Sequence, residues 1–224
     1  MDPTILTFLV AALIFIYPIR YYLRMVKMRF MFHVSVLMLI AVIFHMIAYY
    51  GLVNWGIFVY DFSEFLSNVF ILISAVYIFS GLHDYIYEDR FKALETVVPL
   101  PIVILAETEL FWSSYISFFL LGGVIVLNIL SLVYAYKLYK ARREGSLYWL
   151  ILFGFIFLLS VTVLVYSAVE ILEVIGGGAL LEMYESLFNF IKAFLYLILG
   201  LVLSYSAYYH DRNVRPLIEK LANL

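Results

Sequence analysis

The chain alternates long runs of hydrophobic residues with short segments that carry most of the charged ones. A helix needs about 20 mostly apolar residues to cross the hydrocarbon of a bilayer. Six runs meet this requirement, at about residues 4–24, 30–52, 60–87, 112–138, 146–172 and 182–208. The pattern therefore predicts six membrane-spanning helices.

A seventh apolar segment, residues 92–110, is shorter and leaves two interpretations open. Its charge-free part runs from Thr96 to Ala106 and would be about 17 Å long as a helix. It also contains Pro99 and Pro101, which kink or interrupt helices. Hydropathy alone allows either a short kinked crossing or an interfacial, re-entrant piece.

The positions of the basic residues favour a crossing, because Lys and Arg mark the cytoplasmic side of membrane proteins. With six crossings, the basic clusters that follow the third and fourth runs fall on opposite faces. A seventh crossing at 92–110 puts all of the 14 basic residues except Lys192 on one side. We therefore predict an all-α integral membrane protein with seven transmembrane helices, its N-terminus outside and its C-terminus inside.

Seven spans give a three-one-three arrangement. Residues 1–90 form a first three-helix bundle, 91–110 a short kinked linker helix, 111–210 a second bundle and 211–224 a cytoplasmic tail. A possible parallel repeat relates the bundles, since Glu64-Phe65-Leu66-Ser67-Asn68 and Glu185-Ser186-Leu187-Phe188-Asn189 share the pattern E-x-L-x-N. The alternative is that helices running in the same direction share an acidic start and a basic end.

This three-one-three plan resembles that of SWEET-type sugar facilitators. The resemblance implies substrate-facing asparagines on the third and seventh helices, where this chain has Asn68 and Asn189. The proline-glutamine motifs of that family are absent. The comparison suggests a mechanism and does not establish membership.

Composition supports the membrane assignment and excludes several kinds of chemistry. The chain is 66% hydrophobic and 13% charged, whereas soluble domains are about 45–50% apolar and about 25% charged. The absence of cysteine excludes disulfides, thiolate catalysis and cysteine-bound metals. Glutamine is absent as well, which is a compositional hint of a hyperthermophile. We expect a multi-pass protein of a prokaryotic or archaeal plasma membrane.

Lys192 is the sharpest feature within the predicted spans. Ionisable residues there usually face the bundle interior or a water-filled cavity, and a buried lysine needs a partner to keep its charge. Glu64 and Glu185 are the candidate partners. The predicted substrate or ion site comprises His45, Glu64, Asn68, Tyr166, Glu170, Glu185, Asn189 and Lys192. An aqueous route to Lys192 would favour transport, whereas an occluded ion pair would favour a structural or sensory role.

Carboxylates gather at the predicted outer face. They can concentrate cations or bind a divalent ion, although acidic residues also favour helix N-termini for purely structural reasons. The metal candidates are Glu107, Glu109, Glu173 and Glu182.

We expect no cofactor. Retinal is disfavoured because Lys192 lies nearer the outer end than a mid-membrane Schiff base would and no tryptophan flanks it. A bis-histidine haem is disfavoured because His45 is the one deep histidine. No hydrolase, P-loop or metalloprotease motif occurs, so a membrane enzyme is the least favoured function.

The leading functional prediction is a small transporter or channel for a cationic or polar solute, with proton coupling through Glu64 or Glu185 as an option. The alternative is a seven-helix sensory or accessory subunit that binds an outer ligand and signals to a separate cytoplasmic protein. The expected partners are the lipid bilayer, a solute or cation and such a protein, with no nucleic acid.

Overall fold

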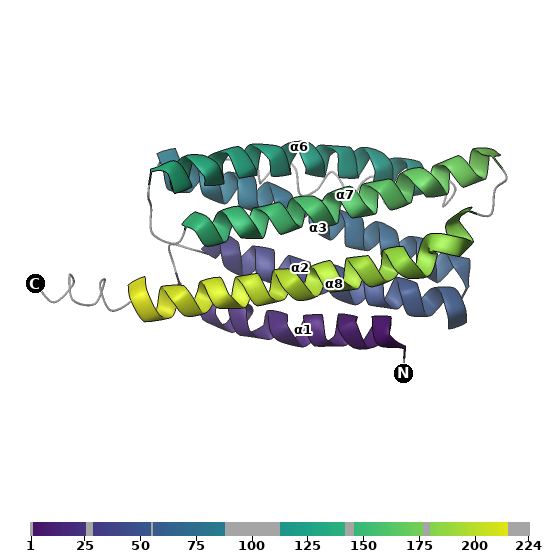
Figure 1. Ribbon diagram of the computed structural model, residues 1–224, viewed down its shortest axis with the longest axis horizontal. Helices are drawn as coiled ribbons and strands as arrows, with labels where there is room; N and C mark the ends of the chain where they lie inside the picture. The colour runs from purple at the N-terminus through teal and green to yellow at the C-terminus, as the bar shows by residue number, and fades with distance from the viewer. Residues whose placement is uncertain are drawn as a thin grey trace, which may run out of the picture.

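The computed structural model is a bundle of six long α-helices that lie side by side (Figure 1). It describes residues 2–25, 29–54, 56–87, 113–141, 146–176 and 180–214, apart from some side chains near helix ends. The helices are α1 Pro3–Tyr22, α2 Arg29–Asn54, α3 Ile57–Tyr87, α6 Ser113–Lys140, α7 Ser146–Gly176 and α8 Leu180–Tyr209, and α8 continues into a π-helical turn, η3 His210–Val214. The described part contains no strand.

The six predicted spans are confirmed as helices, with ends that differ from the predicted ones by up to four residues. Each helix contains a segment long and apolar enough to cross a membrane. Large apolar side chains also cover much of the bundle exterior, for example Leu13 at 66% exposure and Val126 at 58%. A helix that is apolar on its outer face requires lipid or protein around it. The chain thus has the architecture of a multi-pass membrane protein. The predicted helix at 92–110 lies outside the described residues.

The helix starts follow from local chemistry. The Asp2 carboxylate accepts a hydrogen bond from the Thr4 backbone N–H at 2.7 Å and so caps α1. The same carboxylate accepts from the Tyr49 hydroxyl at 2.6 Å, which ties the start of α1 to α2. Between α2 and α3, Gly56 has φ +92°, a conformation that favours glycine, and its N–H donates to the Gly51 carbonyl.

The helices form a closed ring. Each packs against the next in the order α1, α2, α3, α6, α7, α8, and α8 packs back against α1. In Figure 1, α7 and α8 lie in front of the fainter α2 and α3, with α6 and α1 at the two edges of the bundle. The interior of this ring is where side chains from non-adjacent helices can meet.

We call α1, α2 and α3 the first triplet and α6, α7 and α8 the second. The two triplets meet where α3 packs against α6 and where α8 packs against α1, and in both places the paired helices run in the same direction. Phe79 and His83, late in α3, contact Tyr134, late in α6. Tyr22, late in α1, donates a hydrogen bond to Ser206, late in α8, at 3.1 Å. The described end of α3 and the start of α6 therefore lie at opposite ends of the bundle.

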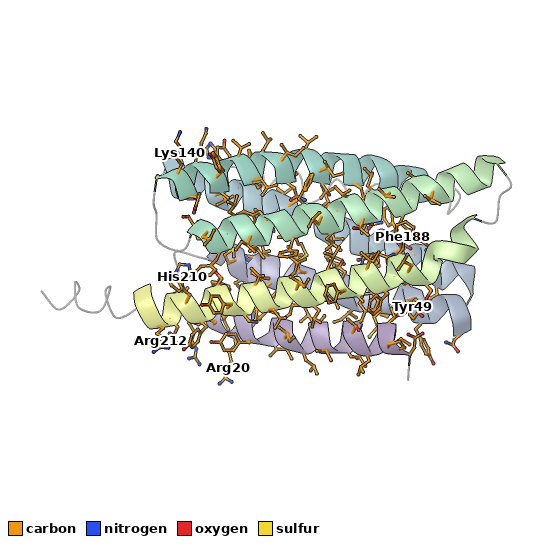
Figure 2. The ribbon with its side chains drawn as sticks, in the orientation of Figure 1. Arg20, Tyr49, Lys140, Phe188, His210 and Arg212 are labelled. Carbon is orange, nitrogen blue, oxygen red and sulfur yellow. The ribbon has the colours of Figure 1, made fainter. Side chains whose placement is uncertain are left out.

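Charge divides the two ends of the bundle. Figure 2 places Arg20, Lys140 and Arg212 together at one end, which we call the basic end, and Tyr49 near the other. We call that opposite end the Asp2 end, because Asp2 contacts Tyr49 there. The described helices thus show the clustering of basic residues that the sequence predicted.

Candidate functional site

Polar side chains meet inside the ring, in the half nearer the Asp2 end. They come from α2, α3, α7 and α8, and all of them are buried. We call this group the central polar cluster: His45, Tyr60, Glu64, Ser67, Asn68, Tyr166, Asn189, Lys192 and Tyr196.

The core of the cluster is an ion pair across the ring. Lys192 Nζ on α8 lies 3.0 Å from Glu64 Oε1 on α3, and the two side chains are 1% and 9% exposed. A helical side chain leans toward the N-terminus of its helix, so Lys192 reaches from its deeper position toward Glu64. The predicted pairing of these two residues is confirmed.

The ammonium of Lys192 has a second contact. It lies 4.3 Å from the centroid of the Tyr166 ring on α7, within the range of a cation–π interaction. One buried lysine therefore links three helices, α3, α7 and α8. Both contacts compensate the desolvation of the charge.

A small aromatic group lies on the Asp2 side of this pair. Tyr60 and Tyr166 are hydrogen-bonded through their hydroxyls, and Phe188 meets the Tyr166 ring edge-on at 5.6 Å. With Ala48 they form a cluster separate from the large apolar core. We call Ala48, Tyr60, Tyr166 and Phe188 the aromatic plug. Tyr60 and Phe188 each precede an ion-pair residue by four positions, about one turn nearer the Asp2 end.

His45 on α2 is held by one ring nitrogen. Its Nδ1 lies 2.8 Å from the Tyr196 hydroxyl and 2.8 Å from Ser67 Oγ. Ser67 donates its single proton to the Ala41 carbonyl at 2.9 Å. The other ring nitrogen of His45, Nε2, is buried and has no hydrogen-bond partner among the described residues.

Two buried amides also offer unused hydrogen-bonding atoms. Neither Oδ1 nor Nδ2 of Asn68 has a partner in the described part of the chain, and the residue is fully buried. Nδ2 of Asn189 is likewise without a described partner. With Nε2 of His45, four such atoms occur in the cluster. An unsatisfied buried polar group costs about 1–3 kcal/mol, so four of them in one cluster are unusual. Groups of this kind suit the binding of a polar ligand.

Six of the eight predicted site residues are buried in this region: His45, Glu64, Asn68, Tyr166, Asn189 and Lys192. Lys192 contacts Glu64 and Tyr166 directly, and Asn68 and Asn189 are buried about one helical turn along from Glu64 and Lys192. The side chains of the other two, Glu170 and Glu185, lie outside the described residues. The same holds for the four metal candidates, Glu107, Glu109, Glu173 and Glu182. Within the described residues, no group of three His, Cys, Asp or Glu could hold a metal ion.

Tyr60 is a cluster member that sequence reasoning missed. The chain has 20 tyrosines, and nothing in their spacing singles out this one. Asn128 on α6 is another buried amide within a span, and its role is different. Its amide donates to Ser160 Oγ at 2.9 Å, which satisfies it between α6 and α7.

Comparison with known proteins adds no name to this geometry. The chain matches no protein-family model, no curated protein and no solved structure.

Proposed function

We propose that the chain is a small transporter or channel that carries a polar or cationic solute through the helix ring, between the triplets 1–90 and 111–210. The observation that carries this proposal is Asn68, whose amide oxygen and nitrogen are both buried without a described partner beside a buried ion pair. Ionisable and polar groups in the interior of a membrane bundle mark solute and ion pathways. Glu64, Asn68, Asn189 and Lys192 would contact the solute.

We further propose that residues 92–110 provide the seventh crossing. The support is that α3 and α6 run in the same direction, so the end of α3 and the start of α6 lie at opposite ends of the bundle and the chain between them must connect the two ends. A crossing between them leaves the basic end in the cytoplasm and Asp2 outside. The membrane would be the plasma membrane of a prokaryote or archaeon.

The two triplets are proposed to be parallel repeats. If α3 is aligned with α8 at an offset of 121 residues, Phe79 corresponds to Gly200. If α1 is aligned with α6 at an offset of 119 residues, Phe15 corresponds to Tyr134. Phe79 stacks on Tyr134 at 5.6 Å, and a Cβ on Gly200 would lie 3.4 Å from the Phe15 ring. The two junctions thus place corresponding positions close together, which supports the proposed repeat and a site on the axis between the two bundles.

Flux into proteoliposomes tests the proposal. The wild type is compared with Asn189→Ala, which removes a buried site amide, and with Asn54→Ala, which removes an exposed amide at the end of α2. We expect solute flux in the wild type and the Asn54 variant, with at least about a tenfold loss in the Asn189 variant, equivalent to about 1.4 kcal/mol. No flux of any ion, amine or neutral polar solute would overturn the proposal.

One observation favours the second candidate, a sensory or accessory subunit. Lys192 is 1% exposed, so the described bundle is closed around the ion pair, as expected for a pair that serves structure or signalling. In that case a stoichiometric protein partner would bind at the basic end, and reconstituted protein would show no flux. Purification of the native complex with and without crosslinking distinguishes the two candidates.

A further inference from the structure

The ionised groups that the structure describes inside the ring cancel one another. Glu64 and Lys192 lie 3.0 Å apart, and the other acidic and basic residues with described side chains occur within a few positions of helix ends. From the described residues, a solute beside the pair therefore meets a dipole with no net charge. Because its distances to both charged groups are similar, attraction by one is largely offset by repulsion from the other.

The lysine is also poorly placed to bind an anion. Its ammonium contacts the Glu64 carboxylate on one side and the Tyr166 ring on the other. An anion would have to replace Glu64, which would leave that carboxylate buried and unpaired. A cation would have to displace Lys192, with the same consequence for the ammonium. Leaving one member of a buried pair uncompensated is strongly unfavourable.

An uncharged solute with hydrogen-bonding groups can instead bind to the unpartnered polar atoms of the cluster. Asn68 presents one acceptor and one amide donor without described partners, Asn189 presents a donor, and His45 presents Nε2. A solute with both hydroxyl or amide donors and acceptors can satisfy these atoms without disturbing the ion pair. A bare ion can satisfy only some of them.

We infer that the Glu64–Lys192 pair determines specificity: it makes the pathway selective for small uncharged solutes that donate and accept hydrogen bonds, and it excludes ions of both signs. The inference rests on the proposed transport function and narrows its substrate class. The sequence predicted a cationic or polar solute, and the inference restricts this to uncharged polar solutes. It also predicts that removing one partner lets an ion of the same sign take its place. Lys192→Met leaves Glu64 without a counter-charge, which an entering cation supplies. Glu64→Gln leaves Lys192 without one, which an entering anion supplies.

The test measures neutral and ionic flux on the same proteoliposomes. Urea and glycerol entry is followed by osmotic reswelling, and rubidium and chloride entry by isotope uptake. We expect the wild type to admit urea or glycerol and to exclude both ions. We expect Lys192→Met to raise rubidium flux at least about tenfold, Glu64→Gln to do the same for chloride, and the double variant to exclude both.

The double variant keeps the test decisive where a single variant fails to fold, because it contains no unpaired charge. Ion flux in the double variant, or ion flux comparable to urea and glycerol flux in the wild type, would overturn the inference while leaving transport intact. Unchanged ion exclusion in both folded single variants would overturn it as well. No flux of any of the four probes in the wild type would overturn the inference, and no flux of any ion, amine or neutral polar solute would instead remove the proposed function on which it rests.

Discussion

The Lys192 ammonium on α8 lies 3.0 Å from the Glu64 carboxylate on α3, although these helices are not adjacent in the ring. The pair therefore bridges the interior of the bundle, and the Tyr166 ring completes the surroundings of the ammonium. Since α3 and α8 belong to different triplets, this contact joins the two halves of the chain at the site proposed to bind solute.

The ion pair gives the first prediction. Lys192→Met or Glu64→Gln alone leaves a buried charge without its partner, which costs about 3–5 kcal/mol. For a chain of this size that corresponds to a fall of at least about 6 °C in the thermal midpoint. Midpoints measured in detergent should fall in both single variants and recover at least partly in the double variant. Lys140→Met, an exposed lysine at the basic end, is the matched control and should change little. Equal midpoints for Lys192→Met and Lys140→Met would contradict a stabilising pair.

The six helices could be predicted because each apolar run is long enough to span a membrane, and length needs no tertiary information. The Glu64–Lys192 pair followed from the isolation of one lysine among apolar residues and from the position of Glu64 on the related helix. The order of the helices around the ring could not be predicted from the sequence. Helices that are apolar on all sides give no periodic face from which to choose neighbours.

The finer contacts of the site depend on how the helices are rotated in the ring. Ser67 contacts His45 and the Ala41 carbonyl because α2 and α3 pack in one register. Tyr60 contacts Tyr166 because of how α3 and α7 are rotated about their own axes in the ring. No local pattern in the sequence encodes these rotations, so the aromatic plug became visible only in the structure.

The Asp2 end gives a prediction about pH. The Tyr49 hydroxyl donates a hydrogen bond to the Asp2 carboxylate. This bond is the largest of the effects that hold the pKa of Asp2 below its ordinary value of 3.8. A carboxylate with a lowered pKa in the folded state contributes stability that is present above 3.8 and is lost as the pH falls through the folded pKa. The thermal midpoint of the wild type should therefore exceed that of Asp2→Asn at neutral pH, and the difference should shrink below pH 3.8. A difference that does not depend on pH would contradict this role of the charge.

Two glycines provide a matched test of helix packing. A Cβ on Gly81 of α3 would overlap the ring of Phe30 on α2, whereas a Cβ on Gly154 of α7 would meet nothing within 4 Å. Alanine favours a helix over glycine equally at both sites, so the difference between the two variants isolates the overlap. We expect Gly81→Ala to be less stable than Gly154→Ala by about 1–3 kcal/mol. Equal thermal midpoints would show that Phe30 moves aside without cost.

The aromatic plug gives a prediction about access. Because the chain has no cysteine, a thiol introduced at Asn68 is its sole thiol. Tyr60→Phe removes the hydroxyl that pairs with Tyr166, a bond with a net contribution of about 0.5–1.5 kcal/mol. If the plug gates the site, alkylation of Asn68→Cys by iodoacetamide should become about three- to tenfold faster. Tyr136→Phe, on the exposed face of α6, should leave the rate unchanged. Equal rates in both backgrounds would show that solutes do not pass the plug.

The most direct test of the central claim, that a solute reaches the central polar cluster, compares two single-cysteine variants in liposomes. Asn68→Cys places the thiol in the cluster. Ala135→Cys places it at an equally buried position on α6, a helix that contributes no residue to the cluster. With iodoacetamide, a small neutral amide, we expect Asn68→Cys to be alkylated at least about tenfold faster than Ala135→Cys. A cysteine at position 68 as unreactive as the one at position 135 would contradict a solute pathway through the ring.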